Sequence, residues 1–134
     1  MAEGNSTDHL HVGVALADAG WHPGAWRSDT ARPSELLTAG YWSDLVGAAE
    51  AALVDFVTIN DGLGLQRDDP LATDHRTDRV RGRLDAVLVA NRIAPTTRAI
   101  GVIPVATTTH TEPFHTSKAI ATLDFVSAGR AATA

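Results

Sequence analysis

The chain has 134 residues, a length within the single-domain range, and its 44% hydrophobic and 20% charged residues are typical of a globular protein. Its net charge of −5 argues against nucleic acid or an anionic membrane surface as the main partner. The absence of cysteine excludes disulfides, a thiolate nucleophile and Cys-based metal sites, and no signal peptide or membrane-spanning stretch is found, so we expect a cytoplasmic protein.

The amino-terminal part of the chain predicts one strand and one helix. Residues 1–8 are polar and acidic and are expected to form a disordered tail. Residues 11–16 (HVGVAL) are a compact apolar run that predicts a strand, and the segment after it holds two tryptophans, two prolines and two glycines, which is typical of a long loop. A helix is expected to open within 34–41 and to run to Ala52. Its apolar face is predicted to consist of Leu45, Ala48, Ala49 and Ala52.

The middle of the chain predicts a second strand and helix separated by a charged segment. Residues 54–59 (VDFVTI) predict the strand, and Asn60, Asp61 and Gly62 form a polar turn at its carboxyl end. Residues 66–83 are dense in Arg and Asp of mixed sign, which predicts an exposed, mobile loop, with phosphate binding by its arginines as the alternative. Residues 84–94 predict a helix. Its expected apolar face consists of Leu84, Val87, Leu88 and Ile93.

The last part of the chain is the most regular. Residues 100–106 predict a buried strand, and the hydroxyls of Thr107, Thr108 and Thr109 follow where it ends. Thr111 is the expected N-cap of a helix with Pro113 in its first turn, and Gly129 is the expected stop. Residues 131–134 begin a fourth strand.

The alternation of four strands and three helices predicts an α/β fold with a parallel sheet. The segment after the first strand lacks a G-x-G-x-x-G motif, so a dinucleotide-binding fold is disfavoured and the amino-terminal half of a (β/α)8 TIM barrel is favoured. A complete barrel typically takes about 250 residues. The 134 residues therefore represent a single partial barrel domain that is a fragment, closes by pairing with another chain, or forms a small open sheet.

Three segments resemble the luciferase-like flavin monooxygenases, and within them the nitrilotriacetate monooxygenase-type branch. They are GWHPGAWR (20–27), FVTINDGL (56–63) and TTTHTEPFHTSKAIATLDFVSAGRAA (107–132). The branch commonly shows G-H-H-x-x-A-W-R after strand one, an aspartate closing strand two, and S-T-T-Y-N-E-P-Y followed by S-L-D-x-L-S-G-G-R-A after strand three. His110 and Thr111 stand where that pattern has tyrosine and asparagine.

The resemblance implies a flavin-dependent monooxygenase that uses reduced FMN, supplied by a separate flavin reductase, and O2 to oxygenate a small-molecule substrate. A deazaflavin is the alternative cofactor. The implied cofactor-binding residues are Asp61, Thr107 and Thr108, and the implied catalytic residues are His22 and His110. The family places its flavin phosphate site in the second half of the barrel, so we expect weak FMN binding.

Each of these residues also has a structural interpretation. Asp61 is an ordinary turn residue, the threonines are a strand end that caps a helix, and a loop histidine is usually exposed. Trp21 and Trp26 are expected to pin their loop onto the barrel, and Arg130 and His115 are expected to be structural.

Two other function classes stay open. His9 and His11 form an H-x-H pair of the kind that binds a catalytic metal in barrel hydrolases, but they precede the strand and therefore lie at its amino end. The other class is a non-catalytic fragment or assembly subunit, either a homo-oligomer or paired with a complementary half.

Two expectations concern the three-dimensional arrangement. Asp61, Thr107, Thr108 and His110 should lie on one rim with His22 nearby, because all follow the carboxyl ends of parallel strands. Six apolar side chains of the strands are candidates for the barrel interior, namely Val12, Val14, Val57, Ile59, Val102 and Val105. Since alternate residues of a strand face the barrel interior, roughly half of this set is expected to lack partners in a lone half-barrel.

Overall fold

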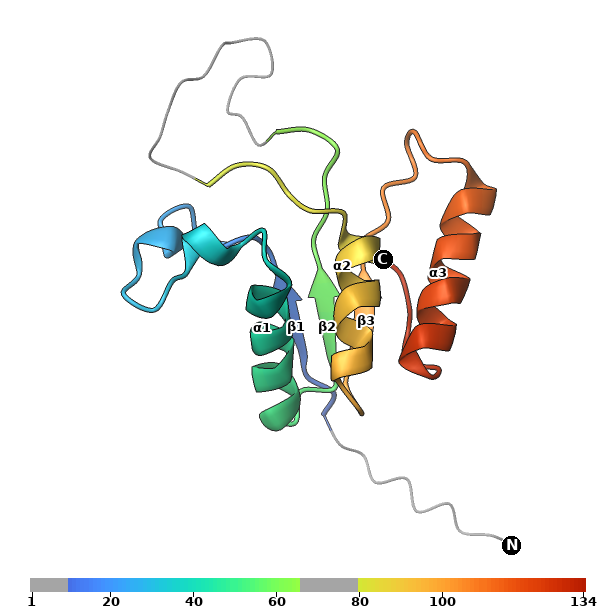
Figure 1. The fold of residues 1–134 in the computed structure, drawn as a ribbon, viewed down its shortest axis with the longest axis horizontal. Helices are drawn as coiled ribbons and strands as arrows, with labels where there is room; N and C mark the ends of the chain where they lie inside the picture. Colours follow the sequence, from blue (N-terminus) through green and yellow to red (C-terminus); the bar gives the residue numbers. More distant parts are fainter. Residues whose placement is uncertain (1–9, 66–79) are drawn as a thin grey trace, which may run out of the picture.

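The computed structural model describes residues 10–65 and 80–134 as a three-stranded parallel sheet with three helices (Figure 1). The strands are β1 (Gly13–Leu16), β2 (Phe56–Ile59) and β3 (Gly101–Pro104), in the order β1-β2-β3. The helices are α1 (Ala39–Ala51), α2 (Ala86–Ile93) and α3 (Pro113–Ser127), with single 3-10 turns at Ala25–Arg27, Pro33–Glu35 and Ala94–Thr96. The expected tail at 1–8 and most of the expected loop at 66–83 lie outside the described residues. The predicted α/β fold with a parallel sheet is confirmed.

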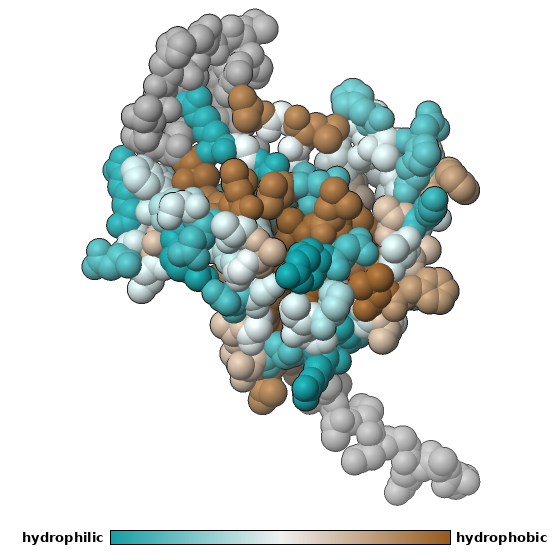
Figure 2. Space-filling view, in the orientation of Figure 1, coloured by the Kyte–Doolittle hydropathy of each residue, from teal (hydrophilic) through white to brown (hydrophobic). Residues whose placement is uncertain are grey.

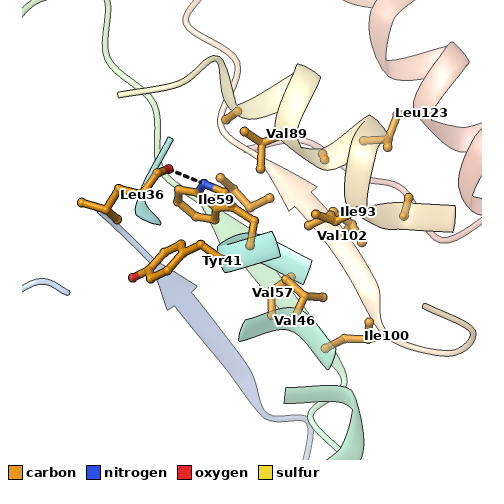
Figure 3. Close-up of a cluster of buried hydrophobic side chains, with 14 residues drawn as sticks. Leu36, Tyr41, Val46, Val57, Ile59, Val89, Ile93, Ile100, Val102 and Leu123 are labelled. Atoms are coloured by element: carbon orange, nitrogen blue, oxygen red, sulfur yellow. Dashed lines mark hydrogen bonds between the residues drawn. The ribbon is translucent and has the colours of Figure 1, made fainter. Parts of the chain in front are cut away.

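The register of the sheet decides which side chains form the core. Val14 of β1, Val57 of β2 and Val102 of β3 lie side by side across the sheet, so all three point to one face. Val57 and Val102 are fully buried there, packed with side chains from all three helices (Figure 3). Val14 remains more exposed because β1 is the edge strand.

The sequence predicts that roughly half of six strand side chains point into a barrel interior, but Val14, Val57, Ile59 and Val102 all point to the helix-covered face. Val57, Ile59 and Val102 pack against the helices rather than toward a barrel interior. Side chains alternate along a strand, so once one residue packs against a helix, every second residue of that strand points to the same face. The opposite face carries the intervening residues, among them Phe56 and Gly13. A Cβ on Gly13 would come within 2.3 Å of the Phe56 ring, so the ring lies directly over that glycine.

Helix α1 buries its aromatic residues rather than its alanines. Tyr41, Trp42 and Val46 are buried, whereas Ala48 and Ala52 of the predicted face are exposed. Leu45 and Ala49 of that prediction do pack against the core. The indole Nε1 of Trp42 donates a 2.9 Å hydrogen bond to the carbonyl of Leu36, drawn dashed in Figure 3, which satisfies the only polar group of that buried ring.

The predicted apolar face of α2 is wrong except at Ile93. The buried residues are Ala86, Val89, Ala90 and Ile93, and Leu88 is 69% exposed. Asp85 caps the helix by accepting the N–H of Leu88 at 2.9 Å. Ala86 and Ala90 of α2 are fully buried against the neighbouring elements. The larger side chains of Leu84 and Leu88 remain exposed to solvent. Figure 2 shows hydrophobic residues gathered on this helix-bearing face of the molecule.

Helix α3 begins and ends as its sequence predicts, apart from its cap. Pro113 occupies the first turn, and Gly129 follows the helix with φ at +82°. The residue in the N-cap position is Glu112 rather than Thr111, and no side chain caps the helix. The proline decides the boundary, since the residue before it is kept out of helical conformation.

The predicted fourth strand is present as an incomplete ladder beside β3. The N–H of Val102 donates to Arg130 O, Ala132 donates to Val102 O, and Ala134 donates to Pro104 O, a parallel pattern between 130–134 and β3. Only an isolated bridge, Val102 with Ala131, is complete. Pro104 has no N–H, so the next bond of the ladder cannot form.

Arg130 anchors the end of α3 to the segment before β3. Its Nε donates to Ser127 O at 2.8 Å, Nη1 donates to Thr97 Oγ1 and Ile100 O, and Nη2 donates to Ala94 O and Thr97 O. All N–H donors of the guanidinium therefore have an acceptor. The expected structural role of Arg130 is confirmed, and it acts by joining three segments.

Candidate functional site

The loops that follow the three parallel strands leave the sheet at the same edge. His22 lies in the loop after β1, Asp61 directly follows β2, and Thr107, Thr108 and His110 follow β3. The structure therefore places every predicted site residue beyond a strand's carboxyl end, where ligands bind in parallel α/β folds.

Asp61 and Thr107 line one cavity of about 250 Å³ between these loops and two helices. Helix α2 contributes Val87 and Leu88 to its wall, and α3 contributes His115 and Thr116. Thr108 and His110 are exposed and do not line this cavity. The structure thus brings together two of the five predicted residues in one wall.

The carboxylate of Asp61 is turned onto the backbone. Its Oδ1 accepts the N–H of Gly62 at 2.6 Å, and its Oδ2 accepts the N–H of Ala86, the first residue of α2, at 3.5 Å. A carboxylate at this position stabilises both the turn and the start of the helix. Each oxygen keeps a second lone pair, so these bonds leave acceptor capacity toward the cavity.

Thr107 is the predicted residue most available to a ligand. Its side chain is half-buried in the cavity wall, and its hydroxyl makes no hydrogen bond with the described residues. A hydroxyl is both donor and acceptor, so it can serve either kind of polar edge. The expected capping role of the threonines is not found at α3, whose N-cap has no side-chain bond.

The sequence does not identify His115 as a candidate site residue, because its position indicates only an ordinary helical residue. It is the third residue of α3, exposed, and lies in the wall of the Asp61–Thr107 cavity. The helix phase set by Pro113 would have indicated it, since the first turn of a helix after a strand faces the carboxyl edge.

His22 belongs to a second cavity, of about 280 Å³, formed mainly by the loop after β1. Trp21 and Trp26 line it, together with Asp18 and Arg83. The Nε1 of Trp21 donates to the carbonyl of Ala15 at 2.9 Å, so this tryptophan pins the loop to β1 as predicted.

The ring of His22 is oriented by its own loop. Its Nδ1 faces the N–H of Gly24 at 3.0 Å and accepts that hydrogen bond. In the neutral ring the proton therefore resides on Nε2, which leaves His22 a donor on its outer side.

Arg83 joins the two cavities and was also missed. Its Nε lies 3.2 Å from Asp18 Oδ2, and its Nη1 donates to the carbonyl of Asp61 at 3.3 Å. The side chain is 20% exposed, so the expectation of an exposed loop over 66–83 is wrong at its last residue. The sequence does not predict the contacts of Arg83, because its two partners lie 65 and 22 residues away along the chain.

Asp18 is itself held in an uncommon backbone conformation. Its φ is +43°, and its carbonyl accepts a hydrogen bond from the Tyr41 hydroxyl at 3.0 Å. Burial raises the pKa of Tyr41, which keeps this donor protonated.

The metal interpretation concerns the other end of the sheet. His11 precedes β1, and its Nδ1 lies 3.2 Å from Asp55 Oδ1 just before β2, while His9 lies outside the described residues. Within residues 10–65 and 80–134, no three His, Asp or Glu side chains are grouped to hold a metal ion. The same residues contain no helix long and apolar enough to span a bilayer.

Two curated enzymes are similar to nearly the whole chain. N-acetyl-S-(2-succino)cysteine monooxygenase of Bacillus subtilis (strain 168) is 30% identical over 122 residues, which are 91% of this chain and 26% of that enzyme. Nitrilotriacetate monooxygenase component A of Aminobacter aminovorans is 27% identical over 127 residues, 91% of this chain and 28% of that protein. The chain thus spans little more than a quarter of the length of the curated relatives it matches. No protein-family model matches it.

Solved structures share the fold. The crystal structure of riboflavin lyase (RcaE) with modified FMN and its substrate riboflavin superposes with a TM-score of 0.76 and 25% identity, covering 92% of this chain and 29% of that one. EDTA monooxygenase (EmoA) from Chelativorans sp. BNC1 superposes with a TM-score of 0.78 and 19% identity, over 92% of this chain and 27% of that one. Long-chain alkane monooxygenase (LadA) superposes with a TM-score of 0.75 and 20% identity, over 95% of this chain and 30% of that one. The three-stranded parallel sheet with its helices therefore corresponds to part of a (β/α)8 barrel.

Proposed function

The chain is related to the luciferase-like flavin monooxygenases, and from this premise we propose that its carboxyl edge forms part of the flavin- and substrate-binding end of such an enzyme. In the proposed reaction a small organic substrate is oxygenated with O2. Reduced FMN, delivered by a separate flavin reductase, supplies the oxygen-activating chemistry when bound. A deazaflavin is the alternative cofactor. The barrel part represented here is proposed to be the amino-terminal one.

The observation that carries this proposal is the meeting of Asp61 and Thr107 in the wall of one cavity at the carboxyl edge. Asp61 offers acceptor oxygens and Thr107 a hydroxyl without a partner among the described residues. A flavin ring edge alternates carbonyl acceptors with an N–H donor, so these two groups fit it chemically. Thr108 follows in sequence and is proposed to add a second hydroxyl.

The size of the cavity fits only part of a cofactor. Complete ligand pockets usually measure about 300–1,000 Å³, and this one measures about 250 Å³. The described residues would therefore bind and orient one edge of the ring, while the remaining walls come from elsewhere. This agrees with a chain that spans about a quarter of its relatives.

The histidines are proposed to act on the substrate. His22 presents Nε2–H outward from the second cavity, and His110 is exposed in the loop after β3. Each can donate a hydrogen bond to a bound substrate or transfer a proton to it.

The test is a titration of FMN and of anaerobically reduced FMN, followed by flavin fluorescence and absorbance. We expect weak but saturable binding that Thr107→Val weakens by roughly 2- to 10-fold, the worth of one hydrogen bond. Thr122→Val is the matched control, because Thr122 is exposed on α3 and bonds only to Lys118 O. Equal affinities of wild type and Thr107→Val would contradict the assignment of Thr107.

A second candidate function is a non-catalytic fragment or assembly subunit, favoured by a cavity of about 250 Å³ that is smaller than a complete ligand pocket. It predicts a folded chain that binds neither form of FMN at millimolar concentration. Sedimentation in the same samples would show whether the chain forms a homo-oligomer or gains flavin binding only with a complementary half.

A further inference from the structure

We propose that the cavity beside Arg83 binds the carboxylate group of an organic ligand, with Arg83 as the anchoring cation and Trp21 as the apolar wall. Both residues line the cavity of about 280 Å³ after β1. The inference rests on the proposed function only in identifying this ligand as the substrate; the binding itself requires no flavin.

The first argument is the way Arg83 is oriented. Its Nε is paired with Asp18 Oδ2 at 3.2 Å, and its Nη1 donates to the carbonyl of Asp61 at 3.3 Å. Its Nη2 has no partner among the described residues and is accessible to solvent. A guanidinium fixed on two sides offers its remaining N–H groups to the cavity with little further loss of conformational entropy.

The second argument is the aromatic wall. Trp21 is 66% exposed even though its Nε1 is anchored on Ala15 O at 2.9 Å. An indole that is fixed in position but left open to solvent is suited to cover the apolar part of a ligand. Trp26 lines the same cavity, and its buried Nε1 also finds no acceptor within the described part of the chain.

The third argument concerns the charge of the ligand. Asp18 lies in the same wall and balances the charge of Arg83, so its carboxylate repels a dianion such as phosphate more strongly than a monovalent carboxylate. A monovalent carboxylate needs only the planar pair of N–H groups that a guanidinium edge provides. His22, a donor through Nε2, is the other polar side chain of the wall.

The test uses 3-phenylpropanoate and its neutral isostere 3-phenylpropanamide, with tryptophan fluorescence as the readout. Trp21 and Trp26 line the cavity, whereas the third tryptophan, Trp42, is buried in the core. We expect saturable binding of the carboxylate in the absence of flavin, and binding of the amide that is weaker by roughly tenfold or more. Equal binding of acid and amide, or no binding at millimolar concentration, would overturn the proposal. Inorganic phosphate that competes as well as the carboxylate would overturn the choice of ligand.

Two variants test the residues themselves. Arg83→Gln should weaken binding of the carboxylate by roughly tenfold or more and leave that of the amide unchanged, whereas Arg98→Gln removes the same charge at an exposed site before β3 and should change neither. Asp18→Asn should strengthen carboxylate binding, because it removes a negative charge while its amide oxygen still accepts from Arg83 and asparagine tolerates the positive φ. Weaker carboxylate binding in Asp18→Asn would show that Arg83 only holds the two loops together. Flavin titrations of the same variants separate this proposal from the proposed function, since carboxylate binding without flavin binding leaves it standing.

Discussion

The carboxylate of Glu50 accepts the backbone N–H of Ala99 at 2.7 Å and so joins the end of α1 to the segment that leads into β3. The same oxygen also accepts the N–H groups of Arg98 and Ile100, at 2.8 and 3.1 Å. These are backbone groups at the amino end of the sheet, opposite the candidate site. The pKa of Glu50 lies below its ordinary value, chiefly because of the bond from Ala99 and then those from Arg98 and Ile100.

We therefore predict that Glu50 contributes stability that depends on pH. A carboxylate whose pKa is depressed by folding stabilises the protein above its unfolded pKa of about 4.3, and this contribution is lost as the pH falls through the folded value. Glu50→Gln should lower the free energy of unfolding by about 1–2 kcal/mol near neutral pH, since the amide accepts less strongly. Urea unfolding between acidic and neutral pH measures this, with Asp29→Asn as a charge-matched control at an exposed site. The difference between wild type and Glu50→Gln should shrink in acid, and a constant difference would contradict the assignment.

Arg130→Lys should destabilise the fold although it conserves the charge. The guanidinium of Arg130 donates hydrogen bonds to acceptors on Ser127, Ile100, Ala94 and Thr97. The ammonium of lysine has only three N–H donors, all on one nitrogen, so it cannot reach all of these acceptors at once. The carbonyls left without donors should cost about 2–4 kcal/mol in total. Thermal and urea unfolding compared with Arg98→Lys would detect it. Equal stability of the two variants would mean that the clamp contributes nothing.

Gly13 and Phe56 should be energetically coupled. A side chain at Gly13 must displace the Phe56 ring, because its Cβ would approach the ring to 2.3 Å. Displacing the ring forces Phe56 out of its favoured rotamer or shifts the strand backbone. We therefore expect Gly13→Ala to destabilise the chain by about 1–3 kcal/mol. In the background of Phe56→Leu the same substitution should be nearly neutral. A double-mutant cycle gives the coupling, and additive effects of the two changes would contradict the close contact.

The two sides of α2 should respond oppositely to substitution. Ile93 is fully buried, so Ile93→Ala should cost about 2–5 kcal/mol of unfolding free energy. Leu88 is 69% exposed, so Leu88→Ala should stay within about 0.5 kcal/mol of wild type. The same denaturation experiment compares both. A large loss at Leu88 would favour the apolar face predicted from the sequence over the observed one.

The sequence by itself determined the positions of the strands and helices and the edge at which the candidate residues gather. Short apolar runs, turn residues and the signals at Pro113 and Gly129 are local, and the alternation of strand and helix implies parallel strands. Once the strands are parallel, Asp61 and Thr107 must follow carboxyl ends at one edge.

Only the tertiary structure decided which faces are buried and which distant groups meet. In α2, the side that carries Ala86, Val89, Ala90 and Ile93 packs inward and Leu88 stays outside, because the way the helix packs on the sheet fixes which side faces the core. Arg83 meets Asp18 across 65 residues, and Glu50 meets Ala99 across 49. Such contacts depend on the geometry of the folded chain. No local pattern of residue types encodes them, since hydrogen bonds between distant segments form only after the sheet has brought those segments together.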